Sequence, residues 1–363
     1  MFNHYFNQKK VLVLGHTGFK GAWLSQWLVL LGAKVIGVSK DIPTKPSLFE
    51  TLKLSEQIED HRCDIRDLES LKTIFEAASP DLVFHLAAQP IVNTSYQSPV
   101  ETFETNVMGT VHVMEAIRQT PSIHKAIIVT SDKCYHNEEW SYGYRESDRL
   151  GGQDPYSASK ASAEIAFHAY FQSFFKGTHQ YVASVRAGNV IGGGDWAAHR
   201  IVPDCMRAWA EKAPVVIRSP LATRPWQHVL EPLSGYLDLA TQLDQTLTGN
   251  AYNFGPDASV NASVSHLIQG LAQYWPNANI QIDKAGAVHH EAGLLKLSCD
   301  KALHDLGWQP TLELAQTIQL TSQWYLENTT HQEMLEITQD QIAFYQDQAK
   351  NMGQAWALDA VTT

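Results

Sequence analysis

The sequence predicts an α/β fold in which a doubly wound parallel sheet carries a second, smaller lobe. Three observations lead to this prediction. Short apolar segments alternate with segments of helical periodicity over residues 1–188. The first apolar segment ends in a glycine-rich turn that precedes a helix. After Gly188 the alternation stops, and glycine and proline residues separate shorter elements.

The first strand and its turn lie within residues 10–31. Four consecutive apolar residues at 11–14 suit a central parallel strand that is covered on both faces. Gly15, Gly18 and Gly21 follow in a G-x-x-G-x-x-G pattern. Without side chains they let a pyrophosphate approach the free N–H groups at the positive end of the next helix. The pattern predicts dinucleotide binding, although such turns also follow strands for structural reasons alone.

The remaining elements continue the alternation. Strands are expected at residues 33–39, 63–65, 81–88, 126–131 and 181–187, and helices at 70–78, 100–119 and 156–175. Ligands of such sheets lie at the carboxyl ends of the strands. Residues 189–345 are expected to form mainly the second lobe, with some segments returning to the first domain. Helical periodicity runs over residues 312–345, and residues 346–363 are expected to form a loose tail.

Composition narrows the classes of function. Hydrophobic residues make up 44% and charged residues 18% of the 363, which is typical of a soluble globular enzyme and excludes a disordered or fibrous chain. The net charge of −11 argues against nucleic acid and anionic membranes as partners. No signal-like N-terminus and no run of about 18 apolar residues is present, so we expect a cytoplasmic protein.

No metal site is expected. The four cysteines lack C-x-x-C spacing, which favours neither zinc nor a disulfide framework. His289, His290 and Glu291 are adjacent, and adjacent residues do not converge on a metal ion as residues four apart on a helix do. A solvated polar loop and a substrate contact are the two alternatives for this stretch.

Tyr156 and Lys160 lie four residues apart at the start of a predicted helix, so their side chains share one face. A tyrosine that acts as a base near neutral pH needs a cation nearby, and the lysine is expected to lower its pKa. An isolated pair of this kind is more often an exposed aromatic beside a solvated lysine. Here Ser131 and Asp132 stand at the end of the preceding predicted strand, where a substrate would lie.

Taken together, several segments resemble the extended short-chain dehydrogenase/reductases, and within them the nucleotide-sugar 4,6-dehydratases. The segments are GHTGFKG at residues 15–21, HLAAQP at 85–90, TSDKCY at 130–135, RAGNVIGGGDW at 186–196 and RPWQHV at 224–229, with the Tyr156-to-Lys160 pattern. The similarity implies an NAD-binding Rossmann domain over residues 1–188, a substrate-binding second lobe and hydro-lyase activity.

The resemblance also implies a reaction of oxidation, elimination and reduction on bound NAD. Tyr156, with Ser131 and Lys160, is expected to take the proton of the sugar 4-hydroxyl, and Asp132 to protonate the departing 6-hydroxyl. Relatives that act on dTDP-glucose have Glu where this chain has Lys133, and the lysine resembles the branch that acts on CDP-glucose. The base that removes the carbon-5 proton stays open, because the usual glutamate is absent.

Two sets of binding residues follow from the same resemblance. The cofactor is expected to contact Gly15, Thr17, Gly18, Phe19, Gly21, Asp64, Ile65, Ala87, Ala88, Asn106, Tyr156 and Lys160. The nucleotide sugar is expected to contact Gln89, Asn189, Arg200 and Arg224, where an arginine fork suits a diphosphate, although either arginine could instead be a surface residue. Ser39 stands where NAD-binding relatives often have an acid, so a preference for NAD over NADP rests on the resemblance alone.

Alternatives remain at this point. Another nucleotide-sugar dehydratase or an epimerase of the same fold is one; the Asp132-Lys133 pair argues against the epimerase, which expels no water. A non-catalytic dinucleotide sensor is the other, and the intact Tyr156 and Lys160 argue against it. The family further implies a homodimer through residues 100–119 and 156–175.

Overall fold

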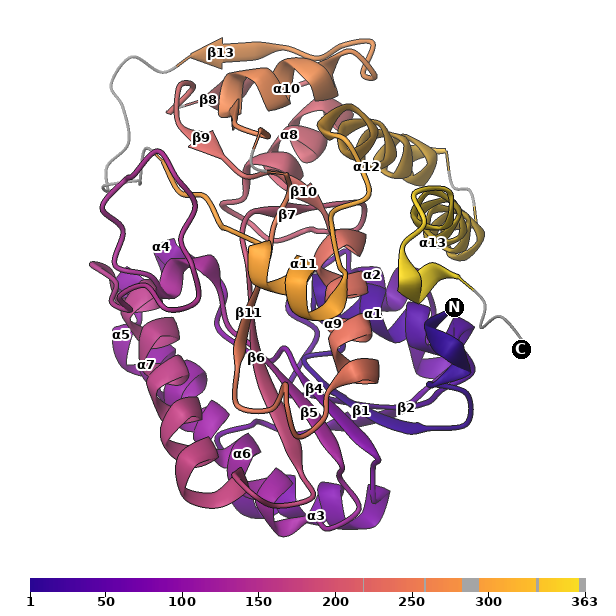
Figure 1. The fold of residues 1–363 in the computed structure, drawn as a ribbon. Coiled ribbons are helices and arrows are strands. Elements are labelled where there is room, and N and C mark those ends of the chain that lie inside the picture. The colour runs from indigo at the N-terminus through magenta and orange to yellow at the C-terminus, as the bar shows by residue number, and fades with distance from the viewer. Residues whose placement is uncertain (218, 258, 283–293, 331–332, 359–363) are drawn as a thin grey trace.

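The computed structural model describes residues 1–217, 219–257, 259–282, 294–330 and 333–358. Within them a seven-stranded parallel sheet has the order β11-β6-β5-β4-β1-β2-β3 (Figure 1). This confirms the predicted doubly wound fold. The strands are β1 (Lys10–Leu14), β2 (Lys34–Ser39), β3 (Glu59–Arg62), β4 (Leu82–His85), β5 (Lys125–Val129), β6 (Tyr181–Ala187) and β11 (Ala251–Phe254).

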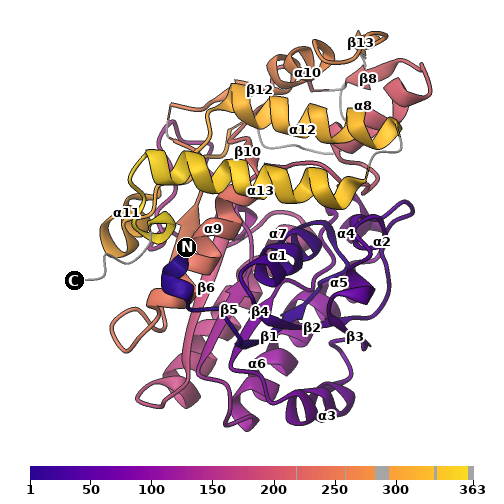
Figure 2. The ribbon, with the colours of Figure 1, turned by 90° about the vertical axis from the view of Figure 1, so that its right-hand side faces the viewer.

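Helices cover both faces of the sheet, because alternate residues of its central strands are apolar on each side. Val11 and Val13 belong to one hydrophobic core, and Leu12 and Leu14 belong to a second one. The first face is covered by α1 (Phe19–Leu30) and α9 (Leu230–Gln242), and the second by α3 (Leu68–Ala78), α6 (Gly109–Gln119) and α7 (Pro155–Tyr170). Figure 2 shows α1 on one side of the strands and α3 and α6 on the other.

Three details differ from the predicted elements. The third strand is residues 59–62, and Cys63 to Ile65 follow its end; the strand reads EDHR, so no apolar run marks it. The predicted helix over residues 100–119 is α5 (Pro99–Phe103) and α6 joined by a π-helical turn, η3 (Glu104–Met108). The helix over residues 156–175 likewise ends in a π-helical turn, η5 (Phe171–Phe175).

The second lobe lies beyond the carboxyl ends of the strands, at the top of Figure 1. Its strand pairs are short: β7 with β10, β9 with β12, and β8 with β13. β11 and α9 come from the same half of the chain but join the sheet domain. The remaining elements of this half are β7 (Val190–Ile191), α8 (Ile201–Ala210), β8 (Val215–Ile217), β9 (Thr223–Arg224), β10 (Gln227–His228), β12 (Ala262–Ser263), α10 (Val264–Ala272), β13 (Ile280–Ile282), α11 (Asp300–Leu306) and α12 (Leu314–Thr329).

The described C-terminal residues are packed, unlike the loose tail expected from residue 346. Helix α13 (Met334–Asn351) continues past residue 345, and the short helix η6 (Ala355–Ala357) follows. Trp356 is buried and stacks on Phe2, with 4.9 Å between ring centroids. Apolar burial therefore joins the N-terminal segment to the chain's described end.

Short helices complete the first domain: η1 (Phe2–His4), α2 (Leu48–Thr51), η2 (Leu54–Glu56), α4 (Val92–Gln97) and η4 (Asp132–Cys134). Among the helices that the structure describes, none combines the length and the apolar character that a membrane crossing requires.

Candidate active site

A cavity of about 1510 Å³ lies at the carboxyl ends of the strands, lined by residues of both the sheet domain and the second lobe. It brings together nearly all the residues predicted from the sequence. Those that line it are Gly15, Thr17, Gly18, Phe19, Gly21, Asp64, Ile65, Ala87, Ala88, Gln89, Ser131, Asp132, Lys133, Tyr156, Lys160, Asn189, Arg200 and Arg224. Neither predicted arginine is a free surface residue.

Asn106 is the predicted residue that does not line the cavity. Its side chain is buried behind the wall, where its Oδ1 accepts a hydrogen bond from the Gln89 N–H at 2.8 Å. Its Nδ2 donates to the Ser159 hydroxyl at 2.9 Å. Asn106 therefore fixes the loop after β4 against α7. In this position it supports the wall of the cavity and does not face the cavity itself.

The glycine turn leaves room where a pyrophosphate would approach. Gly15 has a positive φ of +88°, and a Cβ there would lie 2.7 Å from the Ala87 nitrogen. A Cβ on Gly21 would lie 2.1 Å from the Gly15 oxygen, so these two glycines are needed by the turn itself. Around Gly18 the nearest atom to such a Cβ is that same oxygen, at 3.3 Å.

Gly18 is also the N-cap of α1 and offers no capping side chain. The first N–H groups of α1 are therefore available to an anionic ligand, and the helix dipole favours one. These features fit the pyrophosphate of a dinucleotide.

Ser39, at the end of β2, is already engaged within the protein. Its Oγ lies 3.0 Å from His16 Nδ1, and His16 Nε2 lies 2.8 Å from Asp60 Oδ1. The Thr17 N–H donates to the same Oγ at 3.4 Å. Ser39 therefore holds His16 and Thr17 of the glycine turn in place. Asp41, two residues further along the chain, lines the cavity and is a carboxylate that was not predicted from the sequence.

Asp64 also carries a partner in the protein. The Arg66 guanidinium donates to both of its carboxylate oxygens, from Nε to Oδ1 at 3.1 Å and from Nη2 to Oδ2 at 2.6 Å. This bonding holds the pKa of Asp64 below its usual range. The carboxylate is therefore charged and fixed at the edge of the cavity.

Tyr156 is the second residue of α7. Pro155 and the Asp154 carboxylate, which accepts from the Ser157 N–H at 2.9 Å, fix the N-terminus of this helix. Burial raises the pKa of Tyr156 to about 12, and a hydrogen bond with Ser131 opposes this rise. Burial also lowers the pKa of Lys160 to about 8. The phenol pKa is therefore raised, not lowered as predicted, and the groups that oppose the effect of burial are Ser131 and Arg200 rather than the lysine.

A buried ion pair behind Lys160 was not predicted. Glu164 stands one helical turn further along α7 and binds Arg186 of β6 through two hydrogen bonds, at 2.9 and 2.8 Å. Ser184 donates to the same carboxylate at 2.9 Å, and Thr130 donates to it as well. Glu164 lies four residues after Lys160, and this i, i+4 spacing is the sequence pattern that could have drawn attention to the glutamate.

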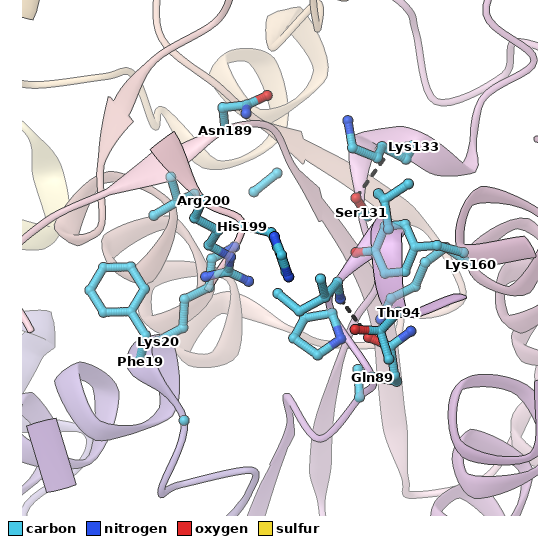
Figure 3. A pocket seen from close by; sticks show the side chains of 18 of the residues that line it. Phe19, Lys20, Gln89, Thr94, Ser131, Lys133, Lys160, Asn189, His199 and Arg200 are labelled. Carbon is cyan, nitrogen blue, oxygen red and sulfur yellow. Dashed lines mark hydrogen bonds between the residues drawn. The ribbon is translucent and has the colours of Figure 1, made fainter. Parts of the chain in front are cut away.

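Asp132 and Lys133 belong to the short helix η4, which begins directly after Ser131 beyond the end of β5. Figure 3 shows Ser131 and Lys133 at this wall of the cavity. The Ser131 hydroxyl donates to Asp132 Oδ1 at 3.0 Å and accepts from the Lys133 N–H at 3.2 Å. Asp132 Oδ2 is buried without a hydrogen-bond partner in the described part of the chain. A buried carboxylate oxygen of this kind is a candidate for bonding to a substrate.

Basic side chains gather at the opposite wall. Arg200 caps the start of α8 and binds Asp195 Oδ2 at 2.9 Å. Lys20 and His199, which the sequence analysis did not single out, lie beside Arg200 in Figure 3 and line the cavity. An anionic group would be stabilised at this wall.

Among the described residues, no group of three histidine, cysteine or acidic side chains is placed to hold a metal ion. The stretch with His289, His290 and Glu291 lies outside the described residues.

Comparison with known proteins agrees with this geometry. The family described as GDP-mannose 4,6 dehydratase matches residues 12–321. CDP-glucose 4,6-dehydratase of Salmonella typhimurium strain LT2 is 44% identical over 351 residues, which are 94% of this chain and 97% of that protein. dTDP-D-glucose 4,6-dehydratase of Homo sapiens is 26% identical, over 88% of this chain and 91% of that protein.

The fold has solved counterparts. A crystal structure of UDP-glucose 4-epimerase with UDP-glucose, from Thermotoga maritima, has a TM-score of 0.78 and 22% identity, and the match covers 89% of this chain and 100% of that one. At this identity the likeness shows the shared fold. From the family match over most of its length, the chain belongs to the GDP-mannose 4,6 dehydratase family of extended short-chain dehydrogenase/reductases.

Proposed function

We propose that the chain is an NAD-dependent hydro-lyase that converts CDP-D-glucose to CDP-4-dehydro-6-deoxy-D-glucose and water. One observation carries the proposal: Asp132, with an unpartnered carboxylate oxygen among the described residues, lines the same cavity as Tyr156 and Lys160. Elimination of water needs an acid in addition to the residue that serves the oxidation. The relative at 44% identity supports the choice of sugar nucleotide.

In this proposal Tyr156 is the base for the oxidation at carbon 4. It takes the proton of the 4-hydroxyl, and its phenol oxygen lies within hydrogen-bonding reach of the Ser131 oxygen, whose own hydrogen is donated to Asp132. The nearby Arg200 charge lowers the pKa of the phenol, against the larger effect of burial. NAD, when bound, would supply an acceptor for the hydride of carbon 4 and a donor of hydride to carbon 6. Lys160 would hold its nicotinamide ribose.

Asp132 serves carbon 6. The Ser131 hydroxyl fixes Oδ1 at 3.0 Å, which leaves Oδ2 to give a proton to the departing 6-hydroxyl. Oδ2 lies on the side of Gly188, where a Cβ would come within 3.3 Å of it. The same Cβ would lie 3.0 Å from Pro225 Cγ, so the glycine lets the acid and Pro225 approach this part of the chain closely.

Lys133 serves carbon 5. Its ammonium group, if it stays charged, stabilises the enolate that forms when the carbon-5 proton leaves; as a free amine it takes that proton itself. Both roles need the side chain in the cavity, which Lys133 lines. The presence of Lys133 where dTDP-glucose relatives have glutamate supports the CDP-glucose branch.

An epimerase of the same fold is the alternative. Tyr156, Lys160 and the glycine turn suit both enzymes, because both oxidise a sugar hydroxyl. The oxygen of Asp132 beside Gly188, unpartnered within the described chain, favours the dehydratase, since an epimerase protonates no leaving group.

NAD is the proposed cofactor over NADP. Ser39 bonds to His16 and to the Thr17 N–H, so its hydroxyl is already bonded within the protein. Asp41 and Lys40 both line this end of the cavity, with Lys40 Nζ 3.9 Å from Asp41 Oδ2, and the Asp41 carboxylate suits the ribose hydroxyls of NAD.

A cytoplasmic homodimer is also proposed. Helix α5 exposes Val100 at 70% and Phe103 at 38%, and helix α7 exposes Ile165 at 61%. These apolar side chains suit a contact between two copies through the helices of residues 99–119 and 155–170. The keto sugar would enter deoxysugar biosynthesis, for which we propose the lipopolysaccharide O-antigen as destination.

The test is direct turnover. Purified protein is incubated separately with CDP-glucose, dTDP-glucose, UDP-glucose and GDP-mannose, and the alkaline ultraviolet absorbance of a 4-keto-6-deoxy sugar is followed. We expect the signal with CDP-glucose at the highest kcat/KM. A higher kcat/KM with another nucleotide would overturn the substrate. Formation of a C4 epimer without water loss would overturn the reaction.

A further inference from the structure

Lys20 occupies an unexpected position for a charged side chain. It is the second residue of α1, directly after Phe19, within the glycine turn that leads into the helix. Its side chain lines the cavity, and Figure 3 shows it beside Arg200. In the described part of the chain, Lys20 forms neither a hydrogen bond nor an ion pair at bonding distance.

The surroundings of Lys20 do not neutralise it. Arg200 and Lys160 act on it as like charges, whereas Asp132 and Asp195 act as opposite charges. Asp195 is already bonded to Arg200 at 2.9 Å and accepts from the Ala197 N–H at 3.1 Å. Burial, followed by the Arg200 charge, lowers the pKa of Lys20 to about 8. Two cations thus converge in the cavity, and of these two only Arg200 has a bonded carboxylate among the described residues.

The two cations come from different halves of the molecule. Lys20 belongs to the sheet domain, and Arg200 belongs to the second lobe, at the start of α8. An anion between them would be held from both sides. The N-terminus of α1 adds N–H groups to the same wall, because Gly18 caps it without a side chain.

We propose that Lys20 is a binding residue for a phosphate oxygen, and that with Arg200 it clamps this phosphate between the sheet domain and the second lobe. The inference rests on the proposed function, which supplies two phosphate-bearing ligands. One source is the pyrophosphate of the dinucleotide, and the other is the diphosphate of the sugar nucleotide. Both present the same chemistry, an exposed anionic oxygen that accepts from an ammonium group.

The experiment compares wild-type protein with Lys20→Met and Lys20→Arg. NAD and CDP are the probes, titrated separately by calorimetry over a range of salt concentrations, with cytidine as the phosphate-free control. Loss of one charge-assisted hydrogen bond should weaken binding about ten- to a hundredfold. Lys20→Arg should recover most of the affinity, and Lys20→Met should reduce the salt dependence. Cytidine binding should stay unchanged.

The NAD and CDP titrations distinguish which of the two ligands supplies the phosphate that Lys20 binds. Weaker binding of CDP alone assigns Lys20 to the substrate, weaker binding of NAD alone assigns it to the dinucleotide, and weakening of both places it where the two phosphates meet. Unchanged affinity and salt dependence for both probes would overturn the proposal. Lys34→Met, exposed at the start of β2, is the matched control. If Lys20→Met does not fold by thermal melting, Lys20→Gln replaces it.

Failure of the proposed function would be visible separately. Turnover of CDP-glucose by the wild-type protein is measured on the same preparation. Absence of turnover would contradict the function, while the NAD arm would still test whether Lys20 binds a phosphate.

Discussion

Replacing Asp132 by asparagine separates acid chemistry from binding. The new amide would keep an oxygen that accepts from the Ser131 hydroxyl, the bond that measures 3.0 Å in the structure. The second oxygen, which has no partner among the described residues, would become an amide NH₂ group that cannot release a proton. Folding should therefore change little. Turnover should fall by roughly 10²–10⁴, the loss expected for a general acid, which equals about 3–5 kcal/mol in activation free energy.

The assay for Asp132→Asn is a single turnover with CDP-glucose, followed by the near-ultraviolet absorbance of the reduced dinucleotide. Oxidation at carbon 4 precedes the step that needs the acid, so the reduced form should accumulate in the variant and not in the wild type. Asp340→Asn, exposed on α13, is the matched control and should behave as wild type. Slow turnover without any accumulation would place the defect before elimination and refute the role of Asp132.

The other predictions concern the base, carbon 5, the turn and stability. Tyr156→Phe should retain NAD binding but lose roughly 10²–10⁴ in kcat, measured by steady-state turnover; near-normal activity would remove the tyrosine from the mechanism. Lys133→Met should lower turnover and slow the uptake of deuterium at carbon 5 in deuterated water, measured by mass spectrometry; unchanged uptake would exclude Lys133 from carbon 5. Gly18→Val should abolish NAD binding while the melting temperature stays close to that of wild type, because its Cβ meets one backbone atom at 3.3 Å; unchanged affinity would place the cofactor elsewhere. Burial raises the pKa of Asp238 from 3.8 to about 7. The folded state thus holds a proton that the unfolded state releases, so stability should fall between about pH 4 and pH 7, by up to about 1.4 kcal/mol per unit. Urea unfolding of Asp238→Asn should show a flatter decline than wild type, and an equal slope would contradict the assignment.

Sequence patterns predicted the parts of the fold that rest on local signals. The run at residues 11–14 and the spacing of Gly15, Gly18 and Gly21 describe a strand and a turn whose requirements are met by neighbouring residues. β3 was misplaced because its residues, EDHR, lie at the sheet edge and carry no apolar pattern. β11 was not identified as a sheet strand, since its pairing with β6 is long-range and joins Ala251 to Ser184.

The candidate site, like the fold, was predicted where local sequence patterns mark its residues. Tyr156 and Lys160 were found from their spacing, but the sign of the phenol's pKa shift depends on burial, which spacing does not report. The Glu164 to Arg186 pair joins α7 to β6, and only the folded chain brings the two together. Lys20 stands inside the glycine turn, but the spacing of the glycines does not report which way its side chain points.

The central claim, that one sugar is oxidised, dehydrated and reduced on a single bound NAD, is tested most directly with CDP-glucose that carries deuterium on carbon 4. The product is isolated and the label is located by mass spectrometry and NMR. Hydride removed from carbon 4 and returned to carbon 6 predicts deuterium in the new methyl group, with no label lost to water. Deuterium that remains on carbon 4, or that leaves for the solvent, would contradict the account.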